Sequence, residues 1–289
     1  MIIDCHVHSL GNESADVIVK ELDRVGIDKA VVLATYPGRD EKTEPVKYMD
    51  FTFREVSDDL QRESTKFVSK LQADAPDRII AFAWIEPRLK NAKKNIEDAV
   101  TKYECKGIKM MPDHWYPYEP AFFPVYEKIQ ELGVPITFHS GILGDNKDSS
   151  RFCQPVYYEV LLNFPDIRFA LAHVSWPWTD ECVGVCDRLK SRLWNVKEEE
   201  KPEKMQMYID ITPGTPKFYR KIALQRILDM DLEDYVIFGT DCPASNFSPW
   251  WQDAREVYTR DRALIKELGY SDEVAEKIFH KNAKRYLKL

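Results

Sequence analysis

Four of the six histidines in this 289-residue chain stand at the ends of short apolar runs. His6 and His8 form a His-x-His pair at the end of the first run, His139 and His173 each end a later run, and Asp241 directly follows another. Alternation along a strand places His6 and His8 on the same face. Imidazole nitrogens and a carboxylate oxygen without thiolates suit zinc, and also manganese, iron or cobalt. We therefore expect one site for a divalent metal ion, with zinc as first choice.

The elements that must bring these side chains together are short β-rich runs separated by amphipathic stretches. Their continuous apolar character is typical of parallel strands that helices cover on both sides. This pattern fits a closed barrel or an open doubly wound sheet, and the Gly-rich turn of a dinucleotide fold is missing after the first run. We predict a single (β/α)₈ TIM barrel over residues 1–289, with its active site at the C-terminal ends of the strands. The predicted strands are Ile2–His8, Lys29–Thr35, Ile79–Ile85, Gly107–Met111, Pro135–His139, Arg168–His173, Gln206–Ile211 and Val236–Thr240.

Helix signals and two insertions complete this outline. We predict helices over Glu13–Val25 and Pro120–Leu132, each followed by a glycine, and an extra C-terminal helix over Asp272–Leu287 with Ser271 as its N-cap. The polar stretch Tyr36–Leu60 follows the second strand and should lie above the mouth of the barrel. The charged stretch Asn195–Lys204 precedes the seventh strand, so we expect a solvated loop at the opposite end.

Composition limits the classes of function. The chain is 44% hydrophobic and 31% charged, with a formal net charge of -7, which argues against binding to nucleic acid. The sequence shows neither a secretory signal at Met1 nor an apolar run long enough to span a membrane, so we expect a cytoplasmic protein. The six scattered cysteines fit reduced thiols, and Cys182 and Cys186 fit helix packing better than metal binding. A small molecule is the expected partner, and either a monomer or a homo-oligomer is compatible with the sequence.

These motifs together resemble the amidohydrolase superfamily, and most closely its amidohydrolase-2 branch of metal-dependent hydrolases and decarboxylases. The resemblance is carried by Asp4-Cys5-His6-Val7-His8, Phe138-His139-Ser140-Gly141, Ala172-His173 and Gly239-Thr240-Asp241-Cys242-Pro243, and it continues into Asn282-Ala283-Lys284-Arg285 near the C-terminus. It implies that His6, His8, His139 and Asp241 bind the main metal. It also implies that Asp241 moves a proton, and that His173 polarises the substrate or binds a second metal.

Lys109, at the end of the fourth predicted strand, has two roles within this resemblance. In some members of the superfamily a lysine on this strand is carboxylated and bridges two metals. In many amidohydrolase-2 members it instead faces a single metal or the substrate. We expect one metal here. Many relatives carry a histidine shortly after this lysine, and Met111 stands at that place in this chain.

Residues that follow the strands are candidates for contacts with the substrate. His114 and Trp115 follow the fourth strand, Arg151 follows the fifth and Trp176 follows the sixth. Aromatic side chains commonly line pockets, and Arg151 could hold a carboxylate. Packing of loops onto helices is the competing explanation for each tryptophan, including Trp178, Trp250 and Trp251.

The resemblance implies a metal-dependent enzyme with either of two reactions. The first is hydrolysis of an amide, ester or lactone by a metal-activated water. The alternative is non-oxidative decarboxylation of an aromatic or unsaturated carboxylic acid at the same metal site. A metal-binding protein without catalysis is the third candidate. The fold is common to all of them, so the choice depends on the site.

Overall fold

The structure, a computed structural model, describes residues 1–37, 56–144, 148–248 and 253–289. Within these ranges the strands form one sheet of parallel pairs, in which each strand from the first to the eighth lies beside the next in sequence. Every predicted strand is present, and each is shorter than predicted. The strands are β1 (Ile3–His8), β2 (Lys29–Leu33), β3 (Ile79–Trp84), β4 (Gly107–Met110), β5 (Ile136–Phe138), β6 (Phe169–Leu171), β7 (Met207–Asp210), β8 (Val236–Ile237) and β9 (Cys242–Pro243).

The sheet closes on itself through the segment that joins β8 to β9. β8 pairs with β7, whereas β9 pairs with β1. Between them, the Cys5 N–H donates to the Phe238 carbonyl at 2.8 Å and the Asp241 N–H donates to the His6 carbonyl at 2.9 Å. β8 and β9 are therefore two pieces of the eighth barrel strand, and the predicted TIM barrel is confirmed.

A buried carboxylate on β1 fastens this closure. Asp4 accepts hydrogen bonds from the Thr240 N–H at 3.0 Å and from the Thr240 hydroxyl at 2.5 Å. Burial raises the pKa of Asp4 to about 7, although the hydrogen bonds from Thr240 act in the opposite direction. The first strand and the last are thus joined by side chain as well as by backbone.

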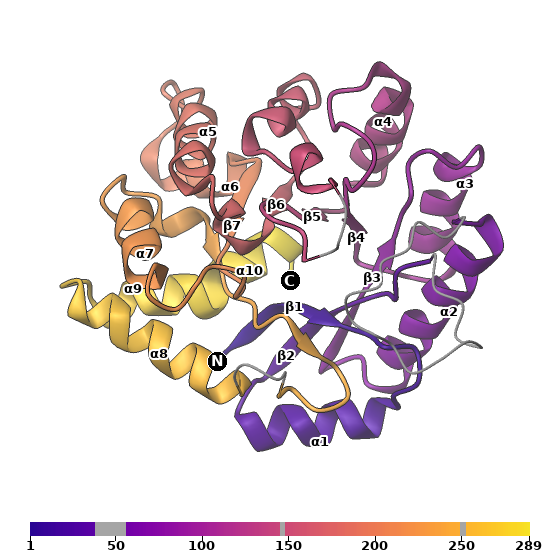
Figure 1. Cartoon of the computed structure of the whole chain (residues 1–289), viewed down its shortest axis with the longest axis horizontal. Coiled ribbons are helices and arrows are strands. Elements are labelled where there is room, and N and C mark those ends of the chain that lie inside the picture. Colours follow the sequence, from indigo (N-terminus) through magenta and orange to yellow (C-terminus); the bar gives the residue numbers. More distant parts are fainter. Residues whose placement is uncertain (38–55, 145–147, 249–252) are drawn as a thin grey trace.

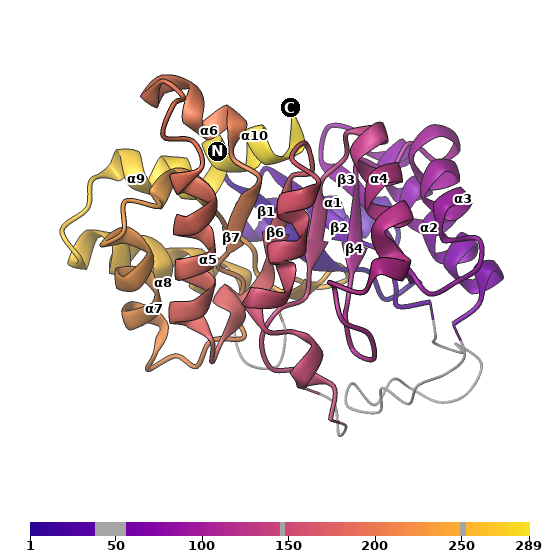
Figure 2. The ribbon, with the colours of Figure 1, turned by 90° about the horizontal axis from the view of Figure 1, so that it is seen from above.

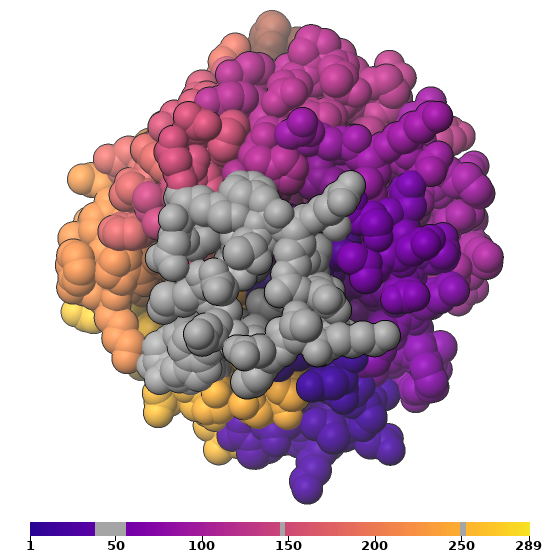
Figure 3. Space-filling view, turned by 45° about the vertical axis from the view of Figure 1, so that its right-hand side comes forward, coloured from indigo at the N-terminus to yellow at the C-terminus, as the bar shows by residue number. Residues whose placement is uncertain are grey.

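Helices surround the barrel in sequence order, as Figure 1 shows. They are α1 (Ala15–Val25), α2 (Asp58–Asp74), α3 (Ala92–Glu97), α4 (Phe123–Leu132), α5 (Thr179–Ser191), α6 (Lys201–Lys204), α7 (Arg220–Leu228), α8 (Ala254–Glu267), α9 (Asp272–Glu276) and α10 (Asn282–Leu287). In place of a full α-helix, a 3₁₀ segment over Pro155–Asn163 connects β5 towards β6. In the space-filling view the colours run around one face in chain order, as successive βα units require (Figure 3).

The first helix shows why the sequence folds in this way. Ile18, Leu22 and Val25 are fully buried at helical spacing. Ser14 accepts a hydrogen bond from the N–H of residue 17, and Gly26 ends the helix in a left-handed conformation with φ of 80°. The glycine predicted to end α4 also has a left-handed conformation.

The core has two parts, and β1 changes sides between them. Ile3 and Cys5 belong to a small cluster that fills the lower barrel interior, whereas Val7 belongs to the large cluster between strands and helices. The pairing of β1 with β2 is irregular between Asp4 and Val7. Such an irregularity shifts the alternation, so that apolar residues face inward first and His6 and His8 face inward above them.

The two ends of the barrel have different roles. In Figure 2 both termini and α6 lie on one side, and the loops that follow the strands lie on the other. At the side of the termini, Tyr286 of α10 closes the interior: it is fully buried, its hydroxyl lies 2.9 Å from Thr137 Oγ1, and its ring contacts Phe82 and Tyr208. Within the described ranges, no helix has both the length and the apolar character needed to cross a membrane.

Three expectations need correction or lie outside the structure. The stretch predicted as a loop before β7 contains a 3₁₀ turn over Glu198–Glu200 and the short helix α6. The predicted closing helix is divided by a π-helical turn over Lys277–Lys281, and Ser271 occupies the N-cap position without a side-chain hydrogen bond. Most of the predicted insertion over Tyr36–Leu60 lies outside the described residues.

Candidate metal centre

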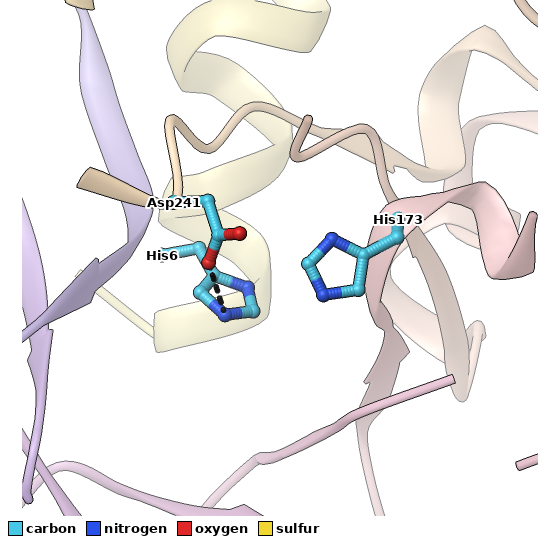
Figure 4. Close-up of side chains that lie close together, drawn as sticks. All are labelled: His6, His173 and Asp241. Atoms are coloured by element: carbon cyan, nitrogen blue, oxygen red, sulfur yellow. Dashed lines mark ion pairs between the residues drawn. The ribbon is translucent and has the colours of Figure 1, made fainter. Parts of the chain in front are cut away.

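The five ligand-type side chains predicted from strand ends lie at one mouth of the barrel. His6 and His8 are on β1, His139 and His173 follow β5 and β6, and Asp241 stands between β8 and β9. The ring of His173 lies 5.4 Å from that of His6 and 4.8 Å from that of His139. Ligand atoms of His6, His173 and Asp241 all lie within 4.8 Å of one another, and Figure 4 shows His173 facing the other two.

Three donor atoms have the spacing that a shared ion requires. His6 Nε2 and His8 Nε2 are 3.2 Å apart, and Asp241 Oδ1 lies 3.0 Å from His8 Nε2 and 3.6 Å from His6 Nε2. With metal–ligand bonds of about 2.0–2.2 Å, neighbouring donors of one ion stand about 3.0–3.5 Å apart. The Nε2 atom of His139 is buried and has no hydrogen-bond partner within the described part of the chain. These residues therefore fit a divalent ion.

Asp210, a residue that the sequence argument missed, orients His6. Its Oδ2 lies 2.7 Å from His6 Nδ1, so the imidazole donates its proton there and keeps Nε2 as a lone-pair donor. Burial and the nearby Lys109 hold the pKa of His6 well below its ordinary value, which keeps the ring neutral. Asp210 is the last residue of β7, just as Asp241 follows β8. Its place at the end of a strand is the signal by which the sequence could have identified it.

The backbone around His173 is unusual. His173, Val174 and Ser175 all have positive φ values, of 62°, 49° and 52°, and Asp241 has a φ of 60°. A β-branched valine rarely adopts this conformation, and strain of this kind is concentrated at functional sites. His173 is held by a contact of 3.1 Å between its Nδ1 and the carbonyl of residue 213. A side chain at Gly214 would meet the His173 ring at 2.7 Å, so only glycine fits there.

The side chains of this candidate metal centre differ in their ionisation states. Burial alone would raise the pKa of Asp241, but the hydrogen bond with His8 and the neighbouring histidines lower it to about 2. Asp241 is therefore a carboxylate at neutral pH. Burial lowers the pKa of His173 and holds that of His139 well below its ordinary value, so both rings are neutral.

Lys109 points into the barrel beneath these ligands. Its side chain is almost fully buried, and its Nζ lies 3.5 Å from His6 Nε2. Burial lowers the pKa of Lys109 to about 8, partly offset by Asp241 and Asp210. The lysine thus lies within reach of these ligands, and its role towards the metal or the substrate stays a prediction.

A cavity of about 560 Å³ opens above the metal candidates. Its volume lies in the range of about 300–1,000 Å³ that small-molecule sites occupy. Aromatic and apolar walls come from Tyr36, Trp84, Met111, Leu143 and Trp176, and the floor contains His8, His139, His173, Asp241 and Lys109. The arrangement suits a planar apolar body with a polar group held at the ligands.

Comparison with known proteins now identifies the family. Residues 3–289 match the family model described as amidohydrolase, Amidohydro_2. The chain belongs to this amidohydrolase family. The resemblance inferred from the sequence is therefore confirmed, whereas no curated protein matches this chain in sequence.

Solved structures share this amidohydrolase fold along their whole length. The 5-carboxyvanillate decarboxylase LigW from Sphingomonas paucimobilis is 16% identical, with a TM-score of 0.67 over 100% of this chain and 99% of that one. The 2,6-dihydroxybenzoate decarboxylase from Rhizobium is 15% identical, with a TM-score of 0.67 over 99% and 98%. A dihydroxybenzoic acid decarboxylase from Polaromonas sp. JS666, with bound manganese and 2-nitroresorcinol, is 16% identical, with a TM-score of 0.66 over 100% and 97%. At these identities the likeness concerns the fold.

The residues predicted to contact the substrate do not all lie at the cavity. Trp176 lines the cavity, as expected. Trp115 does not: it is buried and packs edge-on against Phe122. Arg151 also lies away from the cavity lining, with a side chain 57% exposed and paired with Asp148 at 3.1 Å. Trp250 and Trp251 lie outside the described residues.

His114 belongs to a second polar group behind the cavity wall. Its Nδ1 contacts Asp113, and its Nε2 lies 3.7 Å from Glu86 Oε2. The imidazole thus bridges two carboxylates from its opposite sides, an ion-pair arrangement. Asp113 in turn lies 3.4 Å from the hydroxyl of Tyr36, which lines the cavity. His114 is thus connected to the cavity lining through Asp113 and Tyr36, and it is not itself among the described residues that line the cavity.

Proposed function

We propose that this amidohydrolase-family protein is a metal-dependent decarboxylase of an aromatic or unsaturated carboxylic acid. The observation that carries the proposal is a cavity whose walls are aromatic and apolar and whose floor holds His8, His139, His173 and Asp241. A flat acid would place its ring between the walls and its carboxyl group at the floor. The bound metal, zinc or manganese, would supply Lewis-acid polarisation of that carboxyl group.

The similar structures support decarboxylation rather than the hydrolysis that we placed first from the sequence. Decarboxylases of 5-carboxyvanillate and of dihydroxybenzoates have the same fold over the full length of this chain. Manganese is bound in the Polaromonas protein and also in a 5-carboxyvanillate decarboxylase from Novosphingobium aromaticivorans. This last observation makes manganese an alternative to the zinc that we expected.

The chain's own residues can supply the proton that the reaction requires. Loss of carbon dioxide from a carboxylate breaks the bond between ring and carboxyl carbon, and the electron pair left on the ring takes up one proton. Asp241 is ionised in the structure, but a substrate carboxylate placed beside it raises its proton affinity through like-charge repulsion. We assign proton transfer to Asp241, and we assign orientation of the substrate's carboxyl group to His173, whose ring faces Asp241 in Figure 4.

The test is a product assay on protein reloaded separately with zinc and with manganese. We expect about one tightly bound ion per chain by elemental analysis, and carbon dioxide released in equal amount to the decarboxylated ring, with 2,6-dihydroxybenzoate and 5-carboxyvanillate among the acids tested. Release of an acid from an amide, ester or lactone without carbon dioxide would establish hydrolysis instead. Absence of stoichiometric metal after reloading would contradict both reactions.

One variant separates a chemical role of His173 from a structural one. His173→Asn should retain most of the metal and lose about 100-fold or more in turnover, the usual contribution of a positioned polar group. His280→Asn is the matched control, because His280 lies on the π-helical turn near the C-terminus, away from the cavity lining. Near-normal turnover of His173→Asn would show that His173 is not part of the chemistry.

A further inference from the structure

Two loops bring apolar side chains to the cavity next to the histidines of its floor. Ile142 lines the cavity three residues beyond His139. Trp176 lines it three residues beyond His173, and Leu143 lines it beside Ile142. We call Ile142, Leu143 and Trp176 the apolar ledge. The lining thus changes from polar at the ends of β5 and β6 to apolar in the loops that follow these strands.

Hydrogen bonds hold the backbone of the apolar ledge in place. The Ile142 N–H donates to the Trp176 carbonyl at 2.9 Å, and the Leu143 N–H donates to the Ser150 hydroxyl at 2.9 Å. The two loops are also in close contact at Gly141, which has a φ of 107°: a Cβ there would lie 2.6 Å from the Trp176 carbonyl oxygen. The ledge is therefore preformed, which lowers the entropy lost when a ligand covers it.

Ile142 exposes apolar area at the place where a ligand binds. The residue is 46% exposed, whereas Leu143 beside it is 8% exposed. A single exposed isoleucine on an outer surface is ordinary. Ile142 instead lies in a cavity wall on a fixed backbone, so a ligand that covers it gains the free energy of removing apolar area from water.

The cavity has more room than one ring with a carboxyl group requires. A cavity of about 150 Å³ is enough to hold benzene. The cavity of about 560 Å³ here leaves space beyond a ring whose carboxyl group lies at the floor. A bare aromatic acid would therefore leave part of the apolar lining uncovered, and an apolar group on its ring could cover it.

We propose that the acid decarboxylated here carries an apolar substituent on its ring, and that Ile142, Leu143 and Trp176 bind this substituent. The inference rests on the proposed function, because it assigns the carboxyl group to the metal site. The apolar ledge then selects the substrate, whereas the floor of the cavity performs the reaction. Each methylene group that the ledge buries should raise the affinity about fourfold.

The test measures binding to metal-loaded protein by calorimetry, with benzoate as the unsubstituted probe. Methyl-, ethyl-, propyl- and butylbenzoates, substituted at ring position 3 or 4, lengthen the substituent by one carbon at a time. We expect the affinity to rise about fourfold per carbon over the first two carbons of at least one series. Hydroxymethylbenzoate has as many heavy atoms as ethylbenzoate, yet it should bind less tightly, because apolar surroundings do not replace the hydration of its hydroxyl group.

Ile142→Ala tests the apolar ledge directly. It should weaken the best alkylbenzoate by about 10-fold and leave benzoate within about twofold, whereas Ile142→Val should keep most of the gain. Ile222→Ala is the matched control, because Ile222 is 42% exposed on α7 and lies outside the described cavity lining. It should leave all affinities unchanged, and thermal unfolding checks that each variant is folded.

Three results would overturn the inference. They are an affinity that does not rise with the length of the substituent in either series, a gain that Ile142→Ala leaves intact, and equal weakening of benzoate and the alkylbenzoate by Ile142→Ala.

Binding and reaction are measured separately, so this inference and the proposed function can fail separately. Alkylbenzoates that bind with the expected dependence on Ile142, without carbon dioxide release from any acid, would reject the reaction and retain the apolar subsite. Carbon dioxide release from an acid whose binding does not depend on Ile142 would retain the reaction and reject the apolar substituent.

Discussion

Lys109 is the residue on which the number of metals depends. Its Nζ lies 3.5 Å from His6 Nε2, and its pKa of about 8 leaves part of the amine neutral near physiological pH. A neutral amine can remain an amine beside one ion, or react with carbon dioxide and bridge two ions.

We predict that Lys109→Met keeps close to the original metal content, as one ion held by His6, His8, His139 and Asp241 requires. Elemental analysis of both proteins after identical reloading provides the measurement. Loss of about half the metal would show instead that Lys109 is carboxylated and bridges two ions, and the extra carboxylate should then be visible in a crystal structure.

Glu86 makes the stability of the protein depend on pH. Burial raises its pKa to about 7, although His114 acts in the opposite direction. Because this pKa lies above that of the unfolded chain, the stabilisation is fully present below pH about 4.5 and is lost as the pH rises through about 7.

Glu86→Gln cannot titrate, so we expect the wild type to lose free energy of unfolding relative to this variant between pH 5 and 7.5. The loss should be at most about 3 kcal/mol, at about 1.4 kcal/mol for each unit of pKa shift. Urea unfolding at several pH values measures it, with the exposed Glu97→Gln as control. A difference that stays constant over this range would contradict the raised pKa.

At the scale of elements, irregular strand ends set the geometry of the site. The shift in β1 between Asp4 and Val7 turns His6 and His8 inward, and left-handed residues after β6 aim His173 at Asp241. The loop after β7 packs over His173 so closely that a Cβ at Gly214 would lie 2.7 Å from its ring.

We therefore expect Gly214→Ala to displace His173 and lower turnover by about 10- to 100-fold, since catalysis is sensitive to misplacement of about 1 Å. Gly184→Ala on α5 is the matched control, because a Cβ there has no neighbour within 4 Å. It should leave turnover unchanged and stabilise the helix by about 0.5–1 kcal/mol. Equal effects of both substitutions would show that the contact between Gly214 and His173 does not matter. The assay uses the acid identified by carbon dioxide release.

At the scale of the whole molecule, the barrel separates stability from chemistry. Tyr286 belongs to α10, which lies at the end that carries the termini in Figure 2, and it closes the interior there. The metal candidates lie at the C-terminal ends of the strands. The large aromatic ring and its hydrogen bond to Thr137 stabilise the barrel without contact with the site.

Tyr286→Phe should lower the free energy of unfolding by about 1–3 kcal/mol, because it leaves the buried Thr137 hydroxyl without this partner. Tyr286→Ala should cost about 3–5 kcal/mol through the cavity that it creates. Urea unfolding measures both, and metal content should stay near that of the wild type. Metal loss from Tyr286→Phe at temperatures where the protein is folded would show that the two ends are coupled. Tyr118→Phe, at an exposed tyrosine, is the control.

The sequence by itself determined the barrel and the ligand-type residues at its mouth. Apolar runs of strand length specify parallel strands because helices must bury both faces, and parallel strands in a barrel all end at one mouth. His6, His8, His139, His173 and Asp241 could therefore be grouped before their contacts were known. These rules depend on the pattern of residues close together in the chain, so they can be applied to the sequence alone.

Tertiary structure alone decided which other residues belong to the cavity. Arg151 was expected there and is paired outside it, whereas Arg260 lies on a helix and reaches the wall because Asp261 and Arg220 hold α8 against α7. His114 contacts Asp113 and is not among the described residues that line the cavity. A loop or helix side chain is aimed by packing between segments far apart in the chain, and no local period encodes that direction. The strand ends are aimed by the sheet itself, and this is why their part of the site could be predicted.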